Sequence, residues 1–205
     1  MNAPAPKTIK GRKYDQVLDG ALRVFLQHGF ANANMDEVAR QSQVSKATVY
    51  NYFPDKERLF FEVVKFQCQC QADSAIEVID QTAPVAETLT QAAYETIRLM
   101  QSTFSQRMFR ICVAEADRFP ELGRFFYESG PLMGRHKLAA YFREATAKGE
   151  LVIDDFELAA DQFAELCKAD WWPRCIFGIS VSLSQAEVDR IVKGAVSTFM
   201  HRYGS

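Results

Sequence analysis

The chain has 205 residues, of which 48% are apolar, and a formal net charge of −2. No apolar run approaches the roughly 18 residues of a membrane-spanning helix, so we expect a soluble globular protein of one compact unit or two small ones, with no membrane partner. Residues 1–10 carry no apolar segment typical of a secretion signal, which predicts a cytoplasmic location.

Charge is distributed unevenly along the chain. Residues 1–60 hold nine Lys and Arg against six Asp and Glu, a net charge of +3, which leaves −5 for the remainder. An excess of basic groups favours attraction to phosphate. Residues 1–11, in which a Pro-rich stretch precedes Lys7 and Lys10, are expected to form a disordered arm that either touches DNA or stays a solvated tail.

The first predicted helix runs from about Arg12 to His28. Gly29 follows it, where a helix C-cap requires a positive φ. The apolar side chains of this helix recur at helical spacing, at Val17, Leu18, Ala21, Leu22 and Phe25.

Two short helices joined by a tight turn are predicted between Asn34 and Phe53. Asn34, with Glu37 three residues on, is placed to cap the first of them, and Ser45 is placed to cap the second. Caps eleven residues apart leave room for about two helical turns and a short link, which is the spacing of a helix-turn-helix.

The second short helix has a polar, aromatic-rich face. Val38, Ala39, Val44, Val49 and Phe53 are expected to close a small core. The opposite face then presents amide, hydroxyl, cationic and small apolar groups suited to base edges and phosphates, from Lys46, Ala47, Thr48, Tyr50, Asn51 and Tyr52. An ordinary helical hairpin within a bundle is the alternative interpretation.

The remaining chain predicts helices only, so the fold class is all-α. An N-terminal three-helix helix-turn-helix domain is expected at 1–54 and a second helical domain at 55–205. Within the second domain the predicted helices are Asp55 to Gln81, Val85 to Ser102, Ser105 to Ala116, Pro120 to Ser129, Pro131 to Ala147, Phe156 to Trp172 and Ser184 to Tyr203. Pro173 is expected to kink the helix before it or to end it early.

Several linked motifs between Tyr14 and Val64 resemble the tetracycline-repressor (TetR) family of transcriptional regulators. They include Gly29-Phe30, Met35 to Ala39, Val44 to Tyr50, Tyr52-Phe53 and Lys56 to Phe60. The resemblance implies a homodimer on double-stranded operator DNA, with base contacts from Lys46, Ala47 and Asn51 and phosphate contacts from Thr48, Tyr50, Tyr52 and Lys56. In this family glycine is usual at the position of Gln43, so the resemblance implies a left-handed or strained conformation for Gln43 in the turn.

The segments from Phe109 to Leu122 and Phe126 to Pro131 resemble the C-terminal domain of AefR-type TetR regulators. This second resemblance implies a helical domain for ligand binding and dimerisation. Together the two resemblances predict a ligand-responsive repressor that binds a near-palindromic operator as a homodimer and is released by a small apolar or amphipathic effector.

Aromatic side chains are abundant after residue 60, and they are the candidates for the wall of an effector cavity. Packing in the bundle core is the alternative for most of them. The candidate ligand-binding residues are Phe66, Tyr94, Phe109, Cys112, Phe126, Phe163 and Trp171.

The last predicted helix begins with a capping box at Ser184 and Glu187 and carries one apolar stripe. We expect this stripe to build a four-helix dimer interface, although the same face is equally suited to packing inside one chain. The candidate interface residues are Phe163, Cys167, Val188, Ile191, Val192, Ala195 and Phe199.

Catalytic and metal-binding motifs are not recognisable in the sequence. His28, His136 and His201 are scattered without metal-ligand spacing, and no phosphate-binding loop or nucleophile elbow is found, so neither an enzyme nor a cofactor or metal is predicted. The five cysteines are expected to be reduced and mostly buried, and a redox sensor would need a thiol acidified by a neighbour such as Arg110 or Lys65. A helical adaptor with a vestigial reading head is the competing hypothesis from another class.

Overall fold

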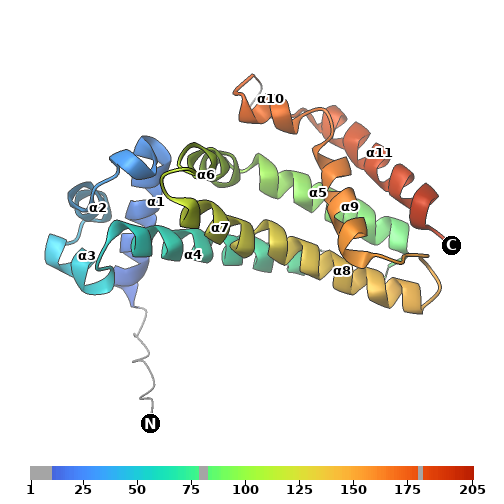
Figure 1. Ribbon diagram of the computed structural model, residues 1–205, viewed down its shortest axis with the longest axis horizontal. Helices are drawn as coiled ribbons and strands as arrows, with labels where there is room; N and C mark the ends of the chain where they lie inside the picture. Colours follow the sequence, from blue (N-terminus) through green and yellow to red (C-terminus); the bar gives the residue numbers. More distant parts are fainter. Residues whose placement is uncertain (1–10, 79–82, 180–181) are drawn as a thin grey trace, which may run out of the picture.

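The computed structural model describes residues 11–78, 83–179 and 182–205, with side chains throughout these ranges except at 72–78. The described residues form eleven helices and no β-sheet, which confirms the all-α prediction. In chain order the helices are α1 (Arg12–Asn32), α2 (Met35–Ser42), α3 (Lys46–Tyr52), α4 (Lys56–Val78), α5 (Val85–Gln101), α6 (Thr103–Ala114), α7 (Pro120–Ser129), α8 (Pro131–Ala147), α9 (Phe156–Lys168), α10 (Trp172–Ile176) and α11 (Gln185–Tyr203). Figure 1 shows α1, α2 and α3 at one end of an elongated molecule and α9 and α11 towards the other.

Helix α1 is interrupted at Gly29, as the sequence predicts. Its φ of 74° and ψ of 176° are not helical, and only the short piece that ends at Asn32 continues beyond it. Because residues with a side chain rarely adopt this region, glycine is the residue suited to the break. Phe30, directly after the break, is buried in the core.

Two separate hydrophobic clusters hold the helices together. The N-terminal core joins α1 to α4 with α6 and α7, through buried side chains that include Phe25, Phe60, Met108 and Leu122. The C-terminal core joins α5 with α8 to α11, around Leu89, Phe142, Phe163, Trp171 and Phe199. The first core therefore extends well past residue 54, where the sequence predicts a domain boundary.

Helix boundaries follow the sequence most closely where turn residues are explicit. The predicted bounds of α7 and α8 are confirmed, and proline stands in the first turn of both. α6 begins two residues earlier than predicted, because Ser102 accepts a hydrogen bond from the Ser105 backbone N–H (3.1 Å) and serves as N-cap. The predicted end of α4 at Gln81 and the arm at 1–10 lie outside the described residues.

The expected helix from Phe156 to Trp172 is two helices. α9 ends at Lys168, Asp170 turns the chain with a φ of 74°, and Pro173 stands in the first turn of α10. Proline has no N–H for the helix interior but fits a first turn, so it begins a new helix instead of kinking the old one. α10 is the one helix that the sequence pattern misses.

The C-terminal end of the chain is fixed to the α8–α9 link. Leu151 and Gly204 form an isolated antiparallel bridge, and the Tyr203 hydroxyl donates to Gln162 (2.6 Å). Across the described helices, none combines the length and apolar character needed to span a bilayer.

Candidate DNA-binding surface and effector region

The helix-turn-helix is held by side-chain caps at both helix starts. The Asn34 side chain accepts from the Glu37 N–H (2.8 Å), and the Ser45 hydroxyl accepts from the Thr48 N–H (3.1 Å). Each cap satisfies a backbone donor that the first turn of a helix leaves unpaired. Gln43 adopts the left-handed conformation expected of the turn, with a φ of 55°, and its N–H bonds the carbonyls of Ala39 and Arg40.

Helix α3 has a buried inner side and a solvent-exposed outer side. Val49 is fully buried, while Lys46, Ala47, Tyr50 and Asn51 are exposed. α3 lies at the end of the molecule, next to α2 (Figure 1), and these four side chains are open to solvent. The arrangement offers one cation, one amide and one phenol on a seven-residue helix.

Four of the seven predicted DNA-binding residues already bond or pack against other residues of the protein, and Lys46, which pairs with Asp36, is one of them. The Thr48 hydroxyl bonds that of Ser45 (2.8 Å), and the Tyr52 ring packs edge-on against Tyr14 at 5.6 Å. Lys56 donates from Nζ to the carbonyls of Ala31 (3.0 Å) and Ala33 (3.1 Å).

Lys56 has a structural role that the sequence does not reveal. Besides its two carbonyl bonds, its Nζ lies 4.6 Å from the centroid of the Phe30 ring. Partial burial lowers the pKa of Lys56 below its ordinary value. The ammonium thus ties the start of α4 to the piece of chain after the Gly29 break, in addition to any contact with phosphate.

Ion pairs on α2 neutralise part of the basic charge of this region. Asp36 pairs with Lys46 (2.7 Å), and Glu37 pairs with Arg40. Hydrogen bonds from Arg40 and Gln41 lower the pKa of Glu37 to about 2, so this carboxylate stays charged at neutral pH. Contact with DNA therefore requires Lys46 either to bridge Asp36 and the nucleic acid or to leave Asp36.

A polar recess of about 340 Å³ lies between α1 and α2, and sequence reasoning did not identify it. Its lining residues are Gln27, His28, Asn32, Asn34, Glu37 and Arg40. These residues come from two helices whose relative placement the local sequence pattern does not give.

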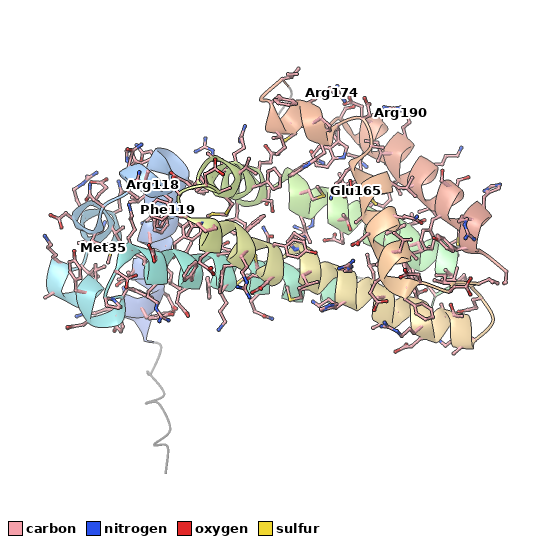
Figure 2. All side chains as sticks on the ribbon, viewed as in Figure 1. Met35, Arg118, Phe119, Glu165, Arg174 and Arg190 are labelled. Carbon is pink, nitrogen blue, oxygen red and sulfur yellow. The ribbon has the colours of Figure 1, made fainter. Side chains whose placement is uncertain are left out.

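Contacts from α6 and the start of α7 connect helices α1 to α3, which we call the reading head, to the rest of the molecule. Arg107 donates to the Leu26 carbonyl (3.0 Å), and Glu115 accepts from the Ala31 N–H (3.2 Å). The Phe119 ring meets the Phe30 ring edge-on at 4.9 Å. Figure 2 shows Arg118 and Phe119 beside α1. All three contacts fall on the last turns of α1, close to the Gly29 break.

The seven predicted ligand-binding residues do not gather around one cavity. Cys112 and Phe126 belong to the N-terminal core, whereas Phe163 and Trp171 are buried in the C-terminal core. Phe66 is exposed on α4 and Phe109 packs edge-on against Trp172 at 5.3 Å.

Tyr94 lines a recess on the C-terminal part of the molecule. This recess has a volume of about 390 Å³ and lies between α5 and α11. It is lined by Tyr94, Glu95, Ile97, Arg98, Gln101, Ser102, Gln185 and Val188.

The stripe that was expected to form a dimer interface is instead buried inside the chain. Ile191, Val192, Ala195 and Phe199 are buried, and Phe199 contacts the rings of Phe142 and Phe163. Val188 and Cys167 are buried in the same C-terminal core. This burial favours the alternative that the stripe packs within one chain.

The described thiols are free, and four of the five are buried. Burial raises the pKa of Cys68 to about 11 and that of Cys112 and Cys167 to about 12. Burial also raises the pKa of Cys175, and the nearby charge of Arg110 only partly offsets this effect. Since a redox sensor needs an acidified thiol, these four cysteines do not fit that role.

Comparison with known proteins gives a consistent result. In structure the chain is similar to a TetR-family transcriptional regulator from Mesorhizobium loti MAFF303099, with a TM-score of 0.88 and 29% identity over 97% of this chain and 100% of that chain. It is also similar to the Flavonoid-responsive Regulator FrrA, with a TM-score of 0.79 and 32% identity over 95% of this chain and 98% of that chain.

Curated sequences match mainly over part of their length. The HTH-type transcriptional regulator YhgD of Bacillus subtilis (strain 168) is 28% identical over 86 residues, 42% of this chain and 45% of that protein. The chain spans less than half the length of the curated relatives it matches. These relatives are described as transcriptional regulators and not as enzymes.

Family models cover both ends of the chain. Residues 17–63 match the model of bacterial regulatory proteins of the tetR family, and residues 87–205 match that of the AefR-like transcriptional repressor C-terminal domain. The second match alone covers more than half of the 205 residues. The capped helix-turn-helix with its outward-facing α3 is the DNA-binding element expected of such a protein, and the chain belongs to the TetR family of bacterial transcriptional regulators, with an AefR-like C-terminal domain.

Proposed function

We propose that this protein is a ligand-responsive transcriptional repressor that acts in the cytoplasm. It binds a near-palindromic operator as a homodimer, and a small apolar or amphipathic effector releases it. The observation that carries this proposal is the outer face of α3, where Lys46, Ala47, Tyr50 and Asn51 are exposed on a helix fixed by the Ser45 cap and by buried Val49. An α-helix fits the major groove, where base edges are distinguishable.

The residues of α3 divide into two proposed roles. Asn51 carries an amide that can bond an adenine edge with two hydrogen bonds, and Lys46 and Ala47 reach bases beside it. Tyr50, Thr48 and Tyr52 hold phosphates, which positions the helix without reading sequence. Tyr52 and Thr48 would do so with side chains whose orientation is already set by Tyr14 and Ser45.

A homodimer places two copies of α3 on two half-sites. One helical turn of DNA separates their centres by roughly 34–36 Å, so the distance between the two heads decides the affinity. Because the inner stripe of α11 is buried, the proposed partner surface is the exposed side of α9 and α11. It includes Leu158, of which half is exposed, and the small residues Gly194 and Ser197.

An effector acts by changing the distance or angle between the heads. Support for a small organic effector comes from the similar regulator FrrA, which is described as flavonoid-responsive. Within this chain, the bonds of Arg107 and Glu115 to the end of α1 provide a physical connection from α6 to the head. A ligand that binds more tightly when α6 is shifted than when α6 is in the position described here lowers operator affinity. The size of this effect is the difference between the two free energies of ligand binding.

Binding to the DNA upstream of the chain's own reading frame tests the proposal. Fluorescence anisotropy should show salt-dependent binding of the dimer, and Asn51→Ala should lose about 1–3 kcal/mol of discrimination between operator and mutated operator. Asn32→Ala makes the same change on the same head outside α3 and serves as the control. Binding to every DNA with equal affinity would contradict a sequence-specific regulator.

A further inference from the structure

The recess between α5 and α11 has the construction of a small-molecule site. Its volume of about 390 Å³ falls at the lower end of the range of ligand pockets. Ile97 is fully buried and lies beneath the floor of the recess, Val188 exposes a small apolar surface, and Tyr94 adds an aromatic ring. Polar groups from the last two turns of α5 and the first turn of α11 complete the lining.

Two hydrogen-bond donors in the recess are held in place and still unused. Arg98 bonds Glu95 through Nε (2.8 Å) and Nη2 (2.7 Å), which leaves the Nη1 side of its guanidinium without a partner among the described residues. The Gln101 oxygen accepts from the Leu183 N–H (3.1 Å), which fixes the amide, and its NH₂ group makes no bond in the described part of the chain. Because Arg98 and Gln101 are three residues apart on α5, they share one side of that helix.

Two acceptors complement these donors. The Tyr94 hydroxyl gives its hydrogen to Asp189 (2.8 Å), so its oxygen remains able to accept. Gln185 likewise donates to Asp189 (2.8 Å) and keeps its carbonyl oxygen available. The recess thus offers donors on α5 and acceptors near α11.

The charges of the recess select against ionic ligands. Arg98 and Glu95 neutralise each other, and Asp189 stands at the rim with two hydrogen bonds already accepted. A carboxylate that pairs with Arg98 would also meet the carboxylates of Glu95 and Asp189, and an ammonium group that pairs with those carboxylates would also meet Arg98. An uncharged ring system with carbonyl and hydroxyl groups avoids both conflicts and uses the donors, the acceptors and the apolar surface together.

We propose that the α5–α11 recess binds a neutral aromatic compound bearing carbonyl and hydroxyl groups, and that this compound is the effector. This inference rests on the proposed function and specifies where and how it is regulated. Ser102, which lines the recess, is also the N-cap of α6, and its hydroxyl accepts from Gln71 of α4 (3.2 Å). A ligand held by Gln101 therefore acts one residue away from the helix that contacts the end of α1.

The test uses 7-hydroxycoumarin, kept below the pKa of its phenol, with decanoate as the anionic probe and tetraphenylphosphonium as the cationic probe. Calorimetry on the full chain should show binding of the coumarin and at least tenfold weaker binding of both ions. Arg98→Ala and Gln101→Glu should each weaken the coumarin about tenfold or more, since each removes a donor. Gln101→Glu keeps the acceptor for Leu183.

Arg124→Ala is the matched control, because Arg124 also pairs with a glutamate on its own helix, Glu128 (3.0 Å), away from the recess. It should leave coumarin binding unchanged, and all variants should keep the melting temperature of the parent. Coumarin should also lower operator affinity of the parent but not of Arg98→Ala. Unchanged coumarin binding in both recess variants, or preferred binding of either ion, overturns the inference. Failure of the unliganded parent to bind operator would contradict the proposed function instead, whatever the calorimetry shows.

Discussion

The two hydrophobic cores are built from different parts of the chain. The N-terminal core combines a compact segment, α1 to α4, with α6 and α7 from the middle of the sequence, while α5, which lies between them, belongs to the C-terminal core. In Figure 1, α6 and α7 lie nearer to α1 than α5 does. The chain therefore crosses from one core to the other and back before residue 131, which couples the two cores through chain connectivity and packing.

The two cores also differ in how their polar contacts are used. In the N-terminal core, Lys56, Arg107 and Glu115 bond backbone groups at the broken end of α1. In the C-terminal region, Asp170 accepts from Arg190 (2.7 Å) and joins Arg174 in a surface network that ties α9 to α10 and α11. Figure 2 places Arg174 and Arg190 near each other at the α10–α11 side. The first set of contacts lies beside the helix-turn-helix, and the second lies on the exposed surface around α10 and α11.

Cutting the chain at residue 54 should have the largest effect, because it divides the N-terminal core. A fragment of residues 1–54 loses Phe60, whose ring lies 5.2 Å from that of Phe25 and 5.3 Å from that of Phe30. We expect the fragment to be unfolded, since domains of about 60 residues are marginal even with an intact core. Circular dichroism and thermal melting against the full chain measure this. A cooperative melt with operator binding would show that the head is an independent module.

A charge in the C-terminal core tests whether its stripe faces inward. Ile191→Glu should destabilise the chain by about 3–5 kcal/mol, because the carboxylate would be buried without a partner. Lys193→Glu, on the exposed side of the same helix, should stay within about 0.5 kcal/mol. Denaturant titration of both variants decides the matter. A stable, monomeric Ile191→Glu protein would restore the stripe as the dimer interface.

Removing one cation from the N-terminal core should have a smaller effect. Lys56→Met keeps an apolar stem over Phe30 but loses the bonds to Ala31 and Ala33, for an expected cost of about 1–2 kcal/mol in stability. If Lys56 also holds a phosphate, the salt dependence of operator binding should flatten by about one unit. Arg58→Met, an exposed neighbour, is the control. Unchanged stability together with an unchanged slope would leave Lys56 without either role.

Two left-handed residues, one in each region, give the finest comparison. Gln43 has a φ of 55° and Asp170 a φ of 74°. Gln43→Gly should stabilise the chain by up to about 1 kcal/mol, because glycine adopts this conformation without steric cost. Asp170→Gly relieves the same strain but removes the pairs with Arg174 and Arg190, so its gain should be smaller. Melting curves that rank the two variants in the opposite order would contradict this account.

Local features of the fold were accessible from the sequence alone. Asn34, Ser45 and Ser184 cap helices because their side-chain oxygens reach the backbone two or three residues ahead, and Gly29 breaks α1 because of its own conformational freedom. Such signals depend on neighbours in the chain. For the same reason the outward residues of α3 could be predicted from the position of buried Val49.

Tertiary packing decided which apolar face meets which neighbour. The apolar pattern of α11 in the sequence would be the same whether α5, α8 and α9 or a second chain covered it. Helical periodicity indicates that a face is buried, but it does not identify the surface that covers the face. The aromatic residues proposed for one cavity were divided between two cores for the same reason. Likewise, Lys56 bonds the end of α1 only because folding brings these two segments within hydrogen-bonding distance. Arg98 and Gln101 line a recess together with α11 for the same reason.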